Sequence, residues 1–239
     1  MSSRESILAN IRLARGNSIR SEPKEGQRTE SLLAIEDDLQ NPKKHMHPLP
    51  AFIEPLHAHP QQWSPFFCDQ ALKLGSSLVT TYDIQTIPSL IKTYLNTQNL
   101  PTQLTCWPEI LEDLRLDWQS QDLHLSARHA HEADQIGLTG VFCAIAETGT
   151  LVFCSGEETP ATNSLLPETH IALVPAERIV CTLEDAFQLI RTEYGTPPRA
   201  INFVSGPSRT ADIEQTLVIG AHGPKRVHII VYTNDASLF

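Results

Sequence analysis

The sequence predicts an α/β protein of three layers, α/β/α, built around a mixed sheet. From residue 65 onward, short apolar runs rich in β-branched residues alternate with segments whose apolar residues recur at helical spacing. Two apolar runs, 138–146 and 150–154, flank a short turn that contains a glycine, which is typical of antiparallel strands. The last run, RVHIIVYT at 226–233, is nearly all apolar in its interior, as expected for a strand buried on both faces.

The first 64 residues differ in composition from the rest. Apolar residues at helical spacing predict a helix over 3–14, and prolines recur too often over 17–65 for a helix or a strand. We therefore expect an N-terminal helix and a Pro/His-rich arm at 1–64, and an α/β domain at 65–239. Four apolar residues predict that the arm docks on a surface of this chain or of a partner: Phe52, Ile53, Leu56 and Trp63.

Capping and breaking residues set the bounds of the elements in the α/β domain. Thr182 and Asp185 form a capping box that predicts the start of a helix, and Gly195 predicts its end. A tight turn after residue 204 predicts a strand before it and a helix from Thr210 after it. The further predicted helices are 65–74, 87–97 and 108–114, and the further strands are 77–81, 102–106, 122–125, 201–204 and a pair within 169–180.

Charge and hydropathy exclude two classes of partner. The chain has 18 Lys and Arg against 28 Asp and Glu, a net charge of −10, and no basic run long enough to follow a phosphate backbone, so we expect no nucleic acid partner. No apolar stretch approaches the roughly 20 residues that span a bilayer, and the N-terminus lacks the apolar core of a signal peptide. We expect a cytoplasmic protein without a membrane span.

Cysteines and histidines do not form metal-binding patterns in the sequence. The five cysteines are odd in number and contain no C-x-x-C pair, which argues against a disulfide framework, a zinc ribbon and an iron–sulfur cluster. In RHAHEAD, His129 and Glu132 would share a helix face but His131 would not. No GxGxxG motif follows a strand, which disfavours a nicotinamide-dependent oxidoreductase. We therefore expect no metal and no cofactor.

The turn SGPSRT at 205–210 is the first candidate site. Backbone N–H groups, hydroxyls and a guanidinium at a helix N-terminus favour an anion, so ligand binding is predicted for Gly206, Ser208, Arg209 and Thr210. Open α/β sheets usually place ligands beyond such strand ends. The alternative is a helix cap in which Ser208 or Thr210 bonds the first turn and Arg209 pairs with a neighbouring acid.

Glu147, in the turn AETGT, is the second candidate. A carboxylate between apolar strands is partly desolvated, which raises its pKa toward the range of a general base or a nucleophile. The alternative is a carboxylate that only bonds the N–H groups of Thr148 and Gly149. Asn163 precedes two leucines and a helix-stopping proline, in a loop that could border the pocket.

Three long segments carry a resemblance to a known family. ADQIGLTGVFCAIAETGTLVF, SLLPETHIALVPAERIVCTLEDAF and SGPSRTADIEQTLVIGAHGPKRVHIIV, in this order within 133–231, resemble the LUD-domain family, specifically its lactate utilization protein C branch. His170 and His222 lie within these segments and could line a pocket. The resemblance implies a fold similar to the isomerase and CoA-transferase-like proteins.

The resemblance also implies a function. It implies a bacterial role in the oxidation of L-lactate to pyruvate, in a system of three proteins of which two partners carry iron–sulfur clusters. This chain would be the member without clusters and without its own redox cofactor. Two alternatives remain open: a free-standing enzyme of the isomerase or acyl-transfer type, with Glu147 as base or nucleophile and Arg209 holding an anion, and a regulatory module that binds a metabolite.

Overall fold

The computed structural model describes residues 53–112, 114–211, 217–220 and 223–234. The chain divides into two compact units, residues 1–49 and 50–239, and the described residues belong to the second. The predicted helix over 3–14 and most of the predicted arm, including Phe52, lie outside the described residues.

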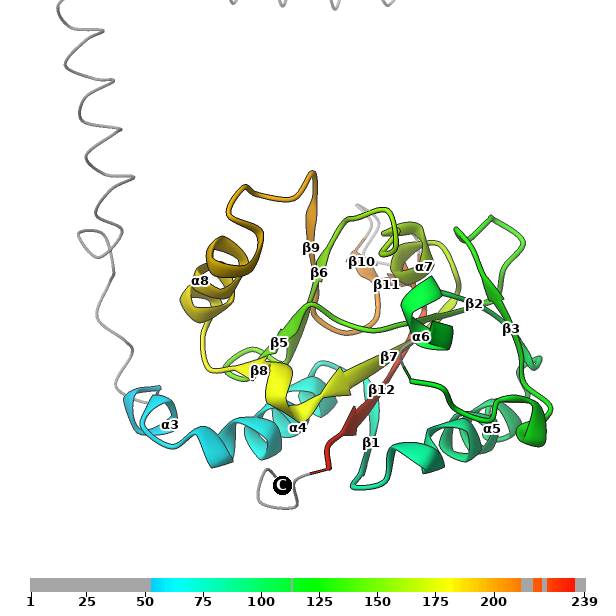
Figure 1. Cartoon of the computed structure of the whole chain (residues 1–239), viewed down its shortest axis with the longest axis horizontal. Coiled ribbons are helices and arrows are strands. Elements are labelled where there is room, and N and C mark those ends of the chain that lie inside the picture. Colours follow the sequence, from blue (N-terminus) through cyan, green and yellow to red (C-terminus); the bar gives the residue numbers. More distant parts are fainter. Residues whose placement is uncertain (1–52, 113, 212–216, 221–222, 235–239) are drawn as a thin grey trace, which may run out of the picture. The chain divides into compact units, whose positions relative to one another are not determined.

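A six-stranded sheet in which every pair is parallel forms the centre of the described unit (Figure 1). Its order is β1-β12-β7-β4-β2-β3. The strands are β1 (Ser77–Thr81), β2 (Gln103–Cys106), β3 (His124–Ala127), β4 (Ile136–Thr139), β7 (Thr169–Pro175) and β12 (Arg226–Tyr232). β7 and β12 lie side by side, and nearly all of their residues are buried, as the apolar run at 226–233 predicts.

Helices follow the early strands, as the sequence predicts. α4 (Trp63–Lys73) precedes β1, α5 (Ile87–Thr97) follows it, and α6 (Pro108–Glu112) follows β2. Gly75 ends the α4 segment with a φ of +91°, a conformation that favours glycine. Single 3₁₀ turns lie at Pro60–Gln62 (η2), Ile84–Thr86 (η3), Gln119–Gln121 (η4) and Ala176–Arg178 (η5).

A second, four-stranded sheet has the order β8-β5-β6-β9. Its strands are β5 (Cys143–Ile145), β6 (Thr150–Cys154), β8 (Ile179–Val180) and β9 (Ile201–Val204). The pairs β5/β6 and β6/β9 are antiparallel, whereas β5/β8 is parallel. α8 (Leu183–Tyr194) packs on this sheet and, as predicted, starts with the capping box of Thr182 and Asp185 and ends at Gly195. α4 contacts both β1 and β8 and so joins the two sheets (Figure 1).

The predicted three-layer α/β fold with parallel and antiparallel strand pairs is confirmed, but the two kinds of pairing are divided between sheets. The run 138–146 splits into β4 of the parallel sheet and β5 of the smaller one, and Gly140 lies where the chain crosses between them. The antiparallel pair around Glu147–Gly149 is β5/β6. The strands within 169–180 do not pair with each other, because β7 and β8 belong to different sheets.

The predicted helix from Thr210 is wrong. β10 (Arg209–Ala211) and β11 (Leu217–Ile219) form an antiparallel pair, with Arg209 opposite Ile219. The apolar spacing that suggested a helix also fits two short strands, and β-branched residues such as Thr210, Val218 and Ile219 favour strands. No helix N-terminus therefore follows the turn at 205–208.

The last part of the predicted arm packs on this chain. Glu54–His57 forms the short helix α3, and Ile53 and Leu56 are buried. Trp63 Nε1 donates a hydrogen bond of 2.9 Å to the carbonyl oxygen of Leu56. Of the two docking surfaces that the sequence left open, these apolar residues use the chain's own.

Candidate functional site

A groove of about 490 Å³ lies at the edge of the parallel sheet where strands begin. It is formed by the end of α4 just before β1, by Leu165 before β7, by the segment 203–209, and by Gly223 and Pro224 before β12. We call it the amino-edge groove. The sequence predicted a site beyond the carboxyl ends of the strands of the main sheet. The groove lies at the amino ends instead, because β9, which precedes the turn, belongs to the four-stranded sheet.

The groove collects most of the predicted ligand-binding residues. Gly206, Ser208 and Arg209 line it, whereas the side chain of Thr210 lies outside the described part of the chain. Sequence reasoning missed Lys73, which reaches the same groove from α4. No local signal could have found Lys73, because only the folded chain brings α4 beside the turn.

Glycine and backbone hydrogen bonds fix the shape of the turn. Gly206 has a φ of +81°, and a Cβ there would lie 2.8 Å from the carbonyl oxygen of Leu74. Ser208 N–H donates to the carbonyl oxygen of Pro224 at 2.9 Å, and Gly220 N–H donates to that of Ser208 at 2.9 Å. The Ser208 N–H is therefore engaged within the protein and is not available to a ligand as part of the predicted cradle of backbone N–H groups.

Two cations give the groove its charge. The guanidinium of Arg209 lies against Gly75, at which a Cβ would overlap Nη2. Within residues 53–112, 114–211, 217–220 and 223–234, neither Arg209 nor Lys73 forms an ion pair. Since the helix dipole is absent, the attraction for an anion comes from these two side chains. The Ser208 hydroxyl adds a hydrogen-bonding group at the groove wall.

Glu147 occupies the β5–β6 turn and does not line the groove. Its pKa lies above its usual range because burial disfavours the charged form, and the negative charges of Glu184 and Asp185 raise it further. No hydrogen bond joins its carboxylate to the N–H of Thr148 or Gly149, although the structure describes all three residues.

A chain of hydroxyls connects the Glu147 turn with the groove. Thr148 Oγ1 donates to Thr150 Oγ1 at 2.8 Å, and Thr150 Oγ1 lies 2.8 Å from Ser205 Oγ. Both turns also pack on α4, since a Cβ at Gly149 would meet the backbone of Ala71. The structure thus places the two predicted sites on one helix without bringing Glu147 and Arg209 into one cavity.

His170 and Asn163 are buried and lie outside the groove. His170 Nε2 lies 2.8 Å from Thr139 Oγ1, and burial lowers the pKa of the imidazole to about 3, so the ring is neutral at pH 7. Its other nitrogen, Nδ1, has no hydrogen-bond partner in the described part of the chain. His222 lies outside the described residues.

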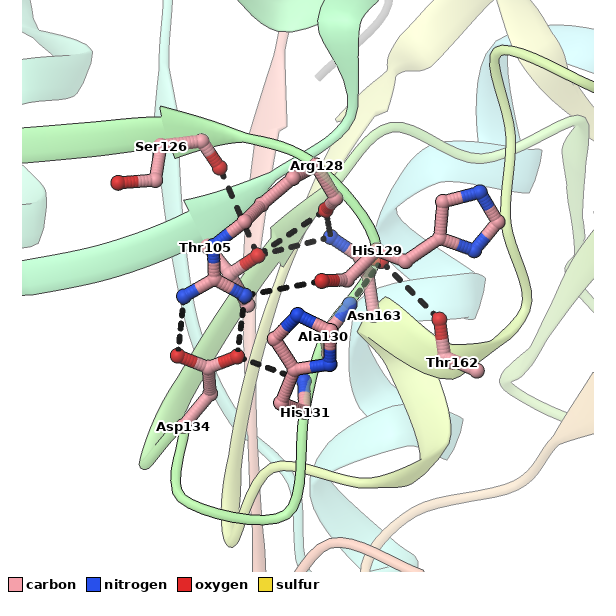
Figure 2. Close-up of polar contacts among 9 residues, drawn as sticks. All are labelled: Thr105, Ser126, Arg128, His129, Ala130, His131, Asp134, Thr162 and Asn163. Atoms are coloured by element: carbon pink, nitrogen blue, oxygen red, sulfur yellow. Dashed lines mark hydrogen bonds and ion pairs between the residues drawn. The ribbon is translucent and has the colours of Figure 1, made fainter.

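Asn163 organises the loop between β3 and β4, as Figure 2 shows. Its Oδ1 accepts from Ala130 N–H at 3.0 Å, and its Nδ2 donates to the Arg128 carbonyl at 2.9 Å and to Thr105 Oγ1 at 3.3 Å. The side chain is fully buried, and both ends of its amide are engaged. These contacts give Asn163 a structural role in the loop.

The same loop contains a bidentate ion pair. Arg128 donates from both Nη atoms to Asp134 at 2.7 Å, and Asp134 Oδ2 also accepts from His131 N–H at 2.7 Å (Figure 2). The Arg128 hydrogen bonds lower the pKa of Asp134 to about 2. Within the described residues, no three His, Cys, Asp or Glu side chains gather as a metal site.

A second cavity, of about 230 Å³, lies beyond the carboxyl ends of β4 and β7. Arg178 occupies its wall and donates to both carboxylate oxygens of Glu193, at 2.7 and 3.0 Å, and to the Phe142 carbonyl at 2.7 Å. Because Glu193 neutralises Arg178, this cavity attracts an anion less than the amino-edge groove does. No sequence pattern predicts this pair, because its two residues are 15 positions apart on different elements.

The cysteines behave as buried apolar residues. All five are free thiols, and Cys106, Cys143, Cys154 and Cys181 are buried while Cys68 is half-buried. Burial raises the pKa of each thiol to about 11 or 12, which keeps the thiols protonated at neutral pH.

Comparisons with known proteins agree with the resemblance seen in the sequence. The chain is 41% identical to "Lactate utilization protein C" of Anoxybacillus flavithermus over 105 residues, which are 44% of this chain and 47% of that protein. It is 40% identical to the protein of the same name from Shouchella clausii over 116 residues, 48% of this chain and 50% of that protein. The matches therefore span about half the length of these relatives.

A solved structure shares the fold. A DUF162 family protein from Deinococcus radiodurans superposes with a TM-score of 0.53 at 21% sequence identity, over 72% of this chain and 98% of that protein. In the described part of the chain, no helix has the length and apolar character required to cross a membrane. The family model of the LUD domain matches residues 107–232, more than half of the 239 residues, and the chain therefore belongs to the LUD-domain family.

Proposed function

We propose that the chain is the component without clusters of a bacterial L-lactate utilization system. In this role it supports the oxidation of L-lactate to pyruvate together with two cytoplasmic iron–sulfur proteins that carry the electrons. The observation behind the proposal is the similarity to proteins named Lactate utilization protein C, at 41% and 40% identity over about half of their length. The cysteine spacing of the sequence, without a C-x-x-C pair, fits a member that contributes no cluster of its own.

The amino-edge groove supplies the molecular part of this role. Arg209 and Lys73 bring two positive charges to a chain whose net charge is −10, and the Arg209 fork can hold a carboxylate through two parallel hydrogen bonds. Ser208 adds a hydroxyl beside them. We propose that a small carboxylate or phosphate binds here and that its binding is required for the function of the lactate system.

Omission of single components tests the proposed role. Lactate-dependent reduction of a dye would be measured with the full chain alone, with the two iron–sulfur partners alone, and with all three proteins. We expect activity only in the complete mixture. Full activity of the two partners without this chain, or activity of this chain alone, would contradict the proposal.

A free-standing enzyme is the second candidate, and the environment of Glu147 favours it. Burial and two neighbouring carboxylates raise the pKa of Glu147. A raised carboxylate pKa is typical of residues that act as general bases. Replacement by Glu147→Gln keeps the size of the side chain but removes the base. If this variant abolished lactate-dependent activity while assembly with the partners persisted, Glu147 would have a chemical role; unchanged activity would exclude it.

A further inference from the structure

The size of the amino-edge groove exceeds what L-lactate requires. Lactate is a three-carbon acid, whereas the groove has a volume of about 490 Å³. Pockets of about 300–1,000 Å³ typically enclose ligands of drug size. We propose that the groove binds an amphipathic carboxylate, whose anionic head pairs with Arg209 and whose apolar body lies along the groove wall. The inference rests on the proposed anion site and specifies its ligand class.

The cationic end of the groove fits a carboxylate head. The guanidinium of Arg209 lies against Gly75, and Lys73 lines the same groove from α4. A planar guanidinium matches the two oxygens of a carboxylate, and the lysine adds charge without restricting geometry. Neither cation has an ion-pair partner within the part of the chain that the structure describes, so an incoming carboxylate does not compete with a protein acid there.

The rest of the wall fits an apolar body. Phe203 lines the groove and has 40% of its surface exposed, while its ring also packs against Phe187 at 5.8 Å between ring centroids. The remaining apolar wall consists of Leu74, Leu165, Val204, Pro207 and Pro224. A ligand as small and polar as lactate would leave this surface in water, whereas an aliphatic chain would cover it.

The cavity of about 230 Å³ beyond β4 and β7 lacks this combination. Arg178 there already donates to both oxygens of Glu193, so a carboxylate ligand would have to displace a protein carboxylate. Its guanidinium also lies 4.9 Å from the centre of the Phe142 ring. The amino-edge groove combines an apolar wall with two cations that form no ion pair among the described residues.

Titration with a series of carboxylates tests the ligand class. The purified full chain would be titrated calorimetrically with L-lactate, butyrate, hexanoate and octanoate at concentrations below micelle formation. We expect the affinity to rise with chain length by up to about fourfold per methylene, which corresponds to the transfer free energy of a buried methylene. Lactate should bind most weakly.

Substitutions in the groove distinguish the binding of the carboxylate head from the binding of the apolar chain of the ligand. Arg209→Gln should weaken every carboxylate by about tenfold or more, because a charge-assisted bidentate contact is lost. Phe203→Ser and, independently, Leu165→Ser should flatten the dependence on chain length and weaken octanoate more than lactate. Arg199→Gln, an exposed arginine at the other end of β9, is the matched control and should change nothing. Circular dichroism and thermal unfolding would establish that each variant is folded.

The outcomes distinguish this inference from the proposed function. Affinity that depends on Arg209 but not on chain length would overturn the amphipathic ligand and keep the anion site. An affinity that Arg209→Gln leaves unchanged, or an absence of binding for the whole series, would overturn both the amphipathic ligand and the anion site.

Discussion

The guanidinium of Arg209 lies directly against Gly75, although the two residues are far apart in the sequence. Gly75 ends the α4 segment with a φ of +91°, and its missing side chain leaves the space that Nη2 of Arg209 occupies. The absence of a side chain at the end of α4 thus leaves room for the cation of the amino-edge groove.

Gly75→Ala should displace Arg209 and weaken carboxylate binding. The new Cβ would overlap Nη2, and the positive φ would cost about 1–2 kcal/mol of folding free energy. Gly195→Ala is the matched control, because Gly195 has a φ of +68° but no atoms within 4 Å of a Cβ. Calorimetry with hexanoate should show weaker binding only for Gly75→Ala. Equal affinities for the two variants would contradict the role of Gly75.

Asp134→Asn should change the acid stability of the protein. The pKa of Asp134 is lowered to about 2, below the value of about 3.9 in an unfolded chain, so the ion pair stabilises the fold above pH 4. That stability is lost as the pH falls from about 4 to 2. Because Arg128 is partly exposed, we expect a contribution of about 1 kcal/mol. Urea unfolding over this pH range should show a shallower decrease for the variant; an identical decrease would contradict the assignment.

Asn163→Ala should destabilise the protein strongly. It would leave Ala130 N–H and the Arg128 carbonyl without their buried partner, at a cost of about 2–4 kcal/mol. Thr162→Ala, at the adjacent position, removes only a weak 3.4 Å contact to the same amide and serves as the control. Chemical denaturation measures both. A loss below 1 kcal/mol for Asn163→Ala would show that water or a rearranged loop replaces these bonds.

His170→Gln should reduce the loss of stability in mild acid. Burial lowers the pKa of His170 to about 3, so the unfolded chain, with a histidine pKa of about 6.5, binds a proton that the folded protein excludes. The folded state therefore loses stability as the pH falls below about 6.5, and continues to do so toward pH 3. Removing the histidine should reduce this slope between pH 6.5 and 5.

Two other histidines help to interpret the pH dependence of the His170 variant. His129→Gln, at an exposed position, accounts for the loss of a histidine as such. His228, whose pKa is lowered to about 4 by burial, should maintain part of the slope in the His170 variant. A slope equal to that of the unmodified protein would mean that the buried ring is protonated in the folded state.

Local sequence signals predicted the elements whose ends are marked by specific residues. The helix at 183–194 has a capping box at one end and a glycine at the other, and the helix at 87–97 has a proline in its first turn. Both were predictable because capping acts within a few residues. The antiparallel pair β10/β11 was not, because the apolar spacing of this segment fits a helix as well, and strand pairing decides the outcome.

The candidate site was predictable only where it is local. Gly206, Ser208 and Arg209 are consecutive or nearly so, and the structure brings them to one groove. Lys73 joins them through the packing of α4, which no pattern around residue 206 reveals. The bidentate pair of Arg128 and Asp134 could not be predicted either, because the conformation of the loop that brings these two side chains together has no sequence signature.

The most direct test of the account is the lactate-dependent dye reduction of the three-protein mixture with Arg209 variants. The unmodified chain and Arg199→Gln should support the same rate, because residue 199 lies outside the groove. Arg209→Gln should lower the rate by about tenfold or more, as expected for the loss of a charge-assisted contact to the anion. A full rate with folded Arg209→Gln protein would show that the groove has no part in the function and would contradict the account.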